Sequence, residues 1–193
     1  MKRSNWRPRL AGRPQSLLSP ILRSWLTEPG SLTARCLRSS RHFSVRLLRF
    51  GKGRALADEA VDGGCDGALA WVREVVLSCD GKPVIFAHTT LAASGNGRLT
   101  RWMARLGSRS LGSLLFAYPG FTRGRIEFLR LDDRHPLYRR AAALCSPPRH
   151  LWARRSLHRL DGQQVLVTEV FLPDILSLLP TTGLPKVFGF ELT

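Results

Sequence analysis

Alternating apolar and polar residues on both sides of an Asp-Gly pair mark two regions of this chain as β-hairpins. The first region runs from Trp71 to Leu91 and turns at Asp80–Gly81. The second runs from Leu151 to Pro173 and turns at Asp161–Gly162. Asp-Gly suits the two central positions of a tight hairpin turn because both positions need a positive φ angle. The pattern therefore predicts two antiparallel strand pairs.

A charged residue interrupts the apolar face of two of these strands. Every second side chain of a strand points to the same side. The two interrupted rows are Val165, Val167, Glu169 and Phe171, and Trp71, Arg73, Val75 and Leu77. An unpartnered buried carboxylate is costly, so Glu169 is expected to be protonated, to have a partner or ligand, or to point to water from an edge strand. Arg73 either extends past the strand edge or serves a ligand. His88 interrupts a third row, formed with Val84, Phe86 and Thr90. A single histidine in such a position more often has a structural role than a functional one.

The remaining pattern predicts an α+β fold. Apolar residues at helical spacing predict helices. The predicted helices cover 17–26, a short segment that opens at Ser31, 96–107, 110–116 and 137–144. Further strands are predicted over 43–50 and 125–131, with a loop from Gly51 to about Gly67. Turns join most strands directly, which favours a single, mostly antiparallel sheet of five or six strands.

The predicted domain covers residues 16–175. Residues 1–15 are rich in arginine and contain two prolines, so they are predicted to form a flexible basic arm. An arginine-rich, acid-poor N-terminus is also typical of an organellar presequence, which is the alternative interpretation. Residues 176–193 are predicted to form a loosely packed tail.

The chain of 193 residues carries a net charge of +16, with 30 basic and 14 acidic residues. Such a surface attracts nucleic acid, anionic lipid or small carboxylates. The charges are scattered and no RRM, KH or zinc-finger pattern is present, which argues against a nucleic-acid partner. No apolar run approaches the roughly 18 residues of a membrane span, and a signal-peptide core is missing. We therefore expect a cytoplasmic protein without stable membrane insertion.

Several kinds of chemistry are excluded by spacing. The four cysteines include no C-x-x-C pair, and the five histidines show no H-x-x-x-H or H-E-x-x-H spacing, so no metal is expected. The G-x-S-x-G elbow of serine hydrolases and the G-x-G-x-x-G dinucleotide fingerprint are also missing. Arg73 and Glu169 remain as candidates. They suit a small, ring-shaped anion whose carboxylate binds the guanidinium and whose hydroxyl meets the carboxyl group.

Four blocks of the sequence resemble bacterial chorismate lyase. They are Trp25–Leu26 with Gly30–Thr33, Trp71–Leu77, Leu111–Phe116, and Leu151–Ser156 continuing to Thr168–Pro173. They occur in the family's order over roughly residues 17–175. The resemblance implies a chorismate lyase-like fold, in which helices and flap-like helix-turns cover a buried ligand pocket on the antiparallel sheet. It implies an enzyme without metal or organic cofactor that converts chorismate to 4-hydroxybenzoate and pyruvate, the first committed step of ubiquinone synthesis. A monomer is expected.

The resemblance also implies roles for individual residues. Arg73 and Glu169 are the expected catalytic residues. Arg73 would bind the ring carboxylate, with help from the backbone at Leu32, and Glu169 would meet the ring hydroxyl, with the backbone near Leu111. We hypothesise that Glu169 assists removal of the ring proton while cationic groups stabilise the departing enolpyruvate.

His88 departs from the family pattern, because some relatives have an arginine there that is thought to face the enolpyruvyl carboxylate. Either His88 is protonated when it binds substrate, or a nearby arginine such as Arg154 or Arg155 substitutes. The alternative function is a non-catalytic sensor of small carboxylates, since effector-binding domains of some bacterial regulators resemble this fold. The 40 or so residues before the first strand are too few for a DNA-binding domain, which favours the enzyme.

Overall fold

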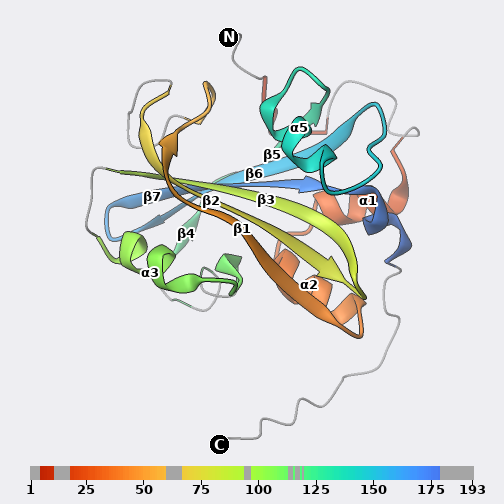
Figure 1. The fold of residues 1–193 in the computed structure, drawn as a ribbon, viewed down its shortest axis with the longest axis horizontal. Helices are drawn as coiled ribbons and strands as arrows, with labels where there is room; N and C mark the ends of the chain where they lie inside the picture. Colours follow the sequence, from red (N-terminus) through yellow and green to blue (C-terminus); the bar gives the residue numbers. More distant parts are fainter. Residues whose placement is uncertain are drawn as a thin grey trace, which may run out of the picture.

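A seven-stranded antiparallel sheet organises the part of the chain that the computed structural model describes, namely residues 5–10, 18–59, 67–93, 97–112, 115, 118 and 120–178. The strands lie in the order β1-β2-β3-β7-β6-β4, and β5 also pairs with β6 (Figure 1). Their bounds are Phe43–Arg54 for β1, Leu69–Cys79 for β2, Lys82–Ala92 for β3, Thr122–Arg123 for β4, Glu127–Leu131 for β5, Leu151–Leu160 for β6 and Gln163–Phe171 for β7. Within these residues no helix is long and apolar enough to cross a membrane.

Both predicted hairpins are present, and they differ in one important respect. Asp80–Gly81 and Asp161–Gly162 all have φ angles between +48° and +80°, as tight two-residue turns require. The β6–β7 ladder is regular from its turn to its far end. The β2–β3 ladder shifts by one residue after the pair Ser78↔Pro83. A shift of one residue turns every later side chain of that strand to the other face.

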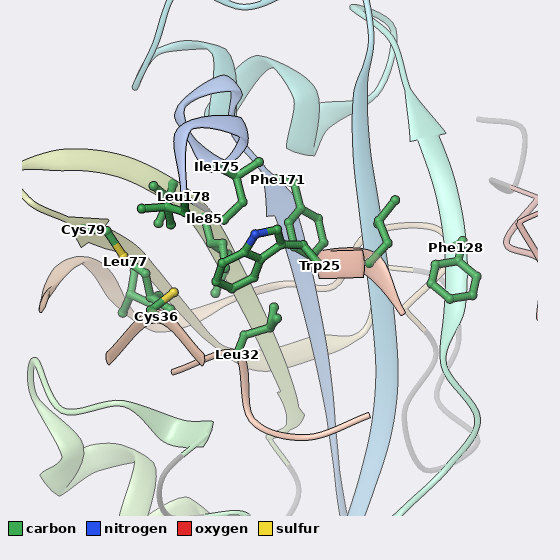
Figure 2. Close-up of a cluster of buried hydrophobic side chains, with 14 residues drawn as sticks. Trp25, Leu32, Cys36, Leu77, Cys79, Ile85, Phe128, Phe171, Ile175 and Leu178 are labelled. Atoms are coloured by element: carbon green, nitrogen blue, oxygen red, sulfur yellow. The ribbon is translucent and has the colours of Figure 1, made fainter. Parts of the chain in front are cut away.

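Helices cover both faces of the sheet. Helices α1 (Pro20–Leu26), α2 (Leu32–Ser39) and α3 (Arg98–Leu106) bury their apolar sides on one face, and α5 (Pro136–Ala142) packs on the other (Figure 1). A short 3-10 helix, η2 (Pro173–Ser177), follows β7. Figure 2 shows Trp25 of α1 and Leu32 and Cys36 of α2 gathered against side chains of the sheet, such as Ile85 and Phe171. This core fixes the first turn of α2 above the sheet.

The structure confirms the α+β fold with one antiparallel sheet and extends the predicted elements in two places. Strand β1 continues to Arg54, which pairs with Leu69, so the segment 51–53 belongs to the strand and not to a loop. Strand β4 is an additional strand that the pattern did not predict, because its two residues are too few to show an alternation. Of the helix predicted over 110–116, Leu111, Gly112 and Leu115 are helical, and residues 113, 114 and 116 lie outside the described residues.

Part of the predicted N-terminal arm belongs to the folded domain. Arg7 and Phe128 of β5 exchange two backbone hydrogen bonds, and Trp6 is buried, with its indole Nε1 donating to Asp58. The prediction of a flexible arm is therefore wrong for residues 5–10. The other predicted arm residues, 1–4 and 11–15, lie outside the described residues, as do residues 179–193 of the predicted tail.

The turn glycine Gly162 provides a test of the hairpin geometry. It has a φ of +77°, and the space that a Cβ atom would occupy is open, so Gly162→Ala adds backbone strain without a clash. We expect the free energy of unfolding to fall by about 1 kcal/mol in urea denaturation. Gly51 of β1 also has open space but no positive φ. Gly51→Ala should therefore leave stability unchanged or raise it, and an equal loss in both variants would contradict the explanation.

Candidate active site

A cavity lies between the sheet face that carries α2 and α3 and two segments that cover it, residues 31–33 and residues 107–112. Strands β1, β2, β3, β4, β6 and β7 each contribute to its lining. The lining residues are Ser31, Leu32, Thr33, Val45, Arg73, Val75, Leu77, Ala87, Thr89, Ser110, Leu111, Gly112, Leu115, Arg123, Arg154, Ser156, His158, Val167 and Glu169. Apolar side chains thus surround a small set of charged groups, an arrangement typical of small-molecule sites.

Arg73 of β2 is 2% exposed and attaches the second covering segment to the sheet. Its Nη2 donates to the carbonyl oxygens of Gly107, at 3.0 Å, and Arg109, at 2.6 Å. Its Nε is buried, and no acceptor for it lies within hydrogen-bonding distance in the described residues. Burial lowers the pKa of Arg73 to about 10, so the guanidinium stays charged at neutral pH. A buried cation with an unsatisfied donor is suited to an anionic ligand.

Glu169 of β7 has a charged partner in the cavity wall. Arg154 stands directly opposite on β6, and its Nε donates to Glu169 Oε2 at 2.7 Å. Nη1 of Arg154 donates to the carbonyl oxygens of Leu26, at 3.3 Å, and Glu28, at 2.6 Å. This ion pair answers the question that the sequence left open about Glu169. It also attaches the turn between α1 and α2 to the sheet.

The two covering segments touch each other above the sheet. The hydroxyl groups of Thr33 and Ser110 form a hydrogen bond. A Cβ atom at Gly112 would lie 3.3 Å from the hydroxyl oxygens of both Ser31 and Thr33, so the absence of a side chain permits this close approach. Ser31 also caps α2, since its hydroxyl oxygen accepts a hydrogen bond from the backbone of Ala34.

Comparison with known families identifies the chain. The model of the family described as "Chorismate lyase" matches residues 3–179. The chain belongs to the chorismate lyase family. The resemblance that the sequence blocks indicated is thereby confirmed.

Curated relatives agree with the chorismate lyase family. A "Probable chorismate pyruvate-lyase" from Dechloromonas aromatica (strain RCB) is 73% identical over 178 residues, which cover 92% of this chain and 99% of the relative. A protein of the same name from Methylobacillus flagellatus is 42% identical over 158 residues, which cover 81% of this chain and 89% of the relative. The expectation of a lyase is confirmed by these matches.

Solved structures share the fold at low sequence identity. The effector domain of PhnF from Mycobacterium smegmatis aligns with a TM-score of 0.51 and 20% identity, over 75% of this chain and 90% of that domain. The structure of PhnF from the same organism aligns with a TM-score of 0.52 and 19% identity, over 82% and 69% of the two chains. These likenesses show the fold alone.

Four of the five residues expected from the resemblance to chorismate lyase line the cavity, namely Arg73, Glu169, Leu32 and Leu111. The fifth, His88, does not. A regular hairpin through Asp80–Gly81 would place His88 opposite Arg73, but the register shift in the β2–β3 ladder places Thr89 there. His88 therefore faces the other side of the sheet, and its predicted contact with substrate in this cavity is wrong.

On that other face, His88 lies between two buried carboxylates. Its Nδ1 is 2.9 Å from Oε1 of Glu74, and its Nε2 is 3.2 Å from Oε2 of Glu59. Arg140 of α5 also bonds Glu74, and Thr90 donates to Glu59. Burial lowers the pKa of His88, but hydrogen bonds and charges from the two carboxylates outweigh burial and raise it to about 8. The histidine joins the segment after β1 to the sheet.

Sequence analysis did not place Arg154 beside Glu169, although the signal was present. The two residues are equally distant from the Asp161–Gly162 turn, so a regular hairpin pairs them. Arg155, the other arginine considered, faces the opposite side, where its Nε donates to Glu127 at 2.7 Å. Arg123 was missed because its strand has no pattern of its own.

Removing the cation of the Arg154–Glu169 pair should destabilise the protein. Arg154→Met leaves the Glu169 carboxylate and two backbone carbonyls without their donor, so we expect a loss of about 3 kcal/mol in the free energy of unfolding. Urea denaturation measures it. Arg159→Met, an exposed change on the same strand, should alter stability by less than about 0.5 kcal/mol. Similar losses in the two variants would contradict the role of the pair.

The His88 cluster predicts a loss of stability at alkaline pH. The folded protein holds the His88 proton up to about pH 8, whereas the unfolded chain releases it near pH 6.5. The stabilisation is therefore complete below pH 6.5 and is lost as the pH rises through 8, with a total of about 2 kcal/mol. Denaturation curves between pH 6 and 9 should show this slope in the wild type and in His42→Gln, an exposed control, but not in His88→Gln. A slope unchanged in His88→Gln would refute the assignment.

Proposed function

We propose that this protein eliminates pyruvate from chorismate and releases 4-hydroxybenzoate, which then serves ubiquinone synthesis. The observation that carries the proposal is that a guanidinium group and a carboxyl group line the same cavity. Arg73 and Glu169, contributed by different hairpins, line the same space beneath two covering segments. Membership of the chorismate lyase family and the names of the relatives support the same reaction.

In this proposal Arg73 binds the ring carboxylate of chorismate. The guanidinium is buried, charged and has an unsatisfied Nε donor, so a carboxylate oxygen restores its hydrogen bonding. Arg73 also holds the backbone at Arg109, two residues before Leu111. Arg154, the partner of Glu169, holds the backbone at Glu28, four residues before Leu32. We therefore group the backbone at Leu111 with the carboxylate and that at Leu32 with the hydroxyl, the reverse of the grouping that the resemblance implied.

Glu169 then accepts a hydrogen bond from the ring hydroxyl and assists the loss of the proton from the hydroxyl-bearing carbon. The electrons of that C–H bond enter the ring, the bond between the neighbouring carbon and the ether oxygen breaks, and enolpyruvate leaves with the electron pair. The ring becomes aromatic, which supplies the driving force, and enolpyruvate gains a proton on carbon to become pyruvate. The pair with Arg154 holds the Glu169 carboxylate in position for this proton transfer.

Purified protein mixed with chorismate should release pyruvate and 4-hydroxybenzoate in equal amounts, as followed by a lactate dehydrogenase assay and by absorbance. Glu169→Gln should lower kcat by about 100-fold or more, because the amide cannot accept the proton. It should still bind 4-hydroxybenzoate, since the amide keeps hydrogen-bonding capacity. Glu127→Gln, on β5 and absent from the cavity lining, is the matched control and should keep full activity.

Two results would overturn the proposal. Full turnover in Glu169→Gln would remove the catalytic role of that residue. Binding of 4-hydroxybenzoate by the wild type without any release of pyruvate from chorismate would instead indicate the alternative, a non-catalytic sensor of small carboxylates.

A further inference from the structure

A third arginine, Arg123 of β4, lines the same cavity from its far edge. Strand β4 pairs with β6, and Arg123 stands opposite His158 in that ladder. Nε of Arg123 donates to the hydroxyl oxygen of Ser156 at 3.1 Å, and Nη1 donates to the carbonyl oxygen of Pro29 at 2.7 Å. Both of these acceptors are neutral oxygens, and the charges of Glu169 and Glu28 also act on Arg123.

Ser156 and His158 fix the orientation of this guanidinium. The two side chains are 4% exposed, and Ser156 Oγ lies 3.0 Å from His158 Nε2. Burial, with the charges of Arg123 and Arg154, lowers the pKa of His158 to about 4, so the imidazole is neutral at neutral pH. Ser156 Oγ accepts a hydrogen bond from Arg123 and shares a second one with His158 Nε2, in which the tautomer of the imidazole decides the donor. This buried network holds the arginine in place.

The charge of the cavity suits a ligand with two carboxylates. Among its described lining residues, three guanidinium groups face one carboxylate, with His158 neutral, which leaves an excess of two positive charges in the lining. Arg73 and Arg154 are buried and Arg123 is half-buried, and an excess of charge removed from water is costly. A dianion compensates both charges, whereas a single benzoate compensates one. Chorismate has two carboxylates, one on the ring and one on the enolpyruvyl group.

The position of Arg123 relative to Glu169 also suits the position of the enolpyruvyl group beside the hydroxyl of chorismate. Arg73 stands on β2, Glu169 on β7 and Arg123 on β4. In the sheet, β3 lies between the first two of these strands and β6 lies between the last two. In chorismate the enolpyruvyl ether is on the ring carbon next to the hydroxyl-bearing one and meta to the ring carboxylate. Its carboxylate therefore extends to one side of the line from the ring carboxylate to the hydroxyl. A cation that binds it has to stand beside Glu169, and Arg123 lies close enough to Glu169 for their charges to interact.

We propose that Arg123, held by Ser156, binds the enolpyruvyl carboxylate of the substrate and so distinguishes substrate from product. This inference rests on the proposed lyase function. The other cationic candidates do not fit the role: His88 and Arg155 face the opposite side of the sheet, and Arg154 is engaged by Glu169. As the C–O bond breaks, the electron pair goes to the enolpyruvate oxygen, so a cation at this end also favours departure of the leaving group.

The product provides an internal control, because 4-hydroxybenzoate lacks the second carboxylate. Arg123→Met should lower kcat/KM for chorismate by about 100-fold, mainly through KM, while changing the Kd for 4-hydroxybenzoate by less than about threefold. Arg73→Met should weaken both. Arg123→Lys should recover part of the loss, since the lysine keeps the charge but not the planar fork. Arg125→Met, an exposed change two residues away, should match the wild type.

A second variant and a second ligand guard against effects on folding. Ser156→Ala keeps the bond from Arg123 to Pro29 and should lower kcat/KM about tenfold without affecting 4-hydroxybenzoate. The dianion 3-(carboxymethoxy)-4-hydroxybenzoate should bind the wild type more tightly than Arg123→Met, as measured by calorimetry.

Each outcome decides between the hypotheses. Equal loss of chorismate and 4-hydroxybenzoate affinity in Arg123→Met would overturn the inference and indicate a structural role at Pro29. Unchanged kcat/KM in that variant would overturn it as well. If the wild type releases no pyruvate, the proposed function fails, and Arg123-dependent binding of the dianion still tests the second anion site separately.

Discussion

Buried guanidinium groups that stand on one face of the sheet determine how this protein closes its cavity. An arginine in an apolar layer needs acceptors for its N–H groups. Arg73 finds two of them on the backbone of residues 107–109, and Arg154 finds two at the end of α1. The covering segments therefore take their positions from the charges beneath them. Cover and binding groups form one hydrogen-bonded unit.

This arrangement links recognition of a ligand to closure of the cavity. The donors of Arg73 are divided between backbone carbonyls and a buried Nε that faces no acceptor in the described residues. An anion that bonds Nε does not compete with the carbonyl contacts made by Nη2. Binding and closure can then reinforce each other, as expected of sites that exclude water during proton transfer.

The features predictable from sequence were those with a local physical cause. The Asp-Gly turns need positive φ angles, and the alternating pattern correctly grouped Arg73 with Val75 and Leu77. The placement of His88 failed because a one-residue register shift has no signature in the alternation of either strand. Arg123 could not be found either, because its position depends on pairing between a two-residue strand and β6. The enclosure of the cavity depends on contacts between segments distant in the chain.

Strand β1 forms an outer edge of the sheet, pairing only with β2 among the described residues. Unpaired strand edges invite association with other chains. Four exposed basic side chains lie along this strand, namely Arg46, Arg49, Lys52 and Arg54. If two molecules aligned these edges, eight positive charges would be brought together, and repulsion would separate them. Part of the unusual charge of the chain thus opposes aggregation, and this protection weakens as salt shortens the range of electrostatic forces.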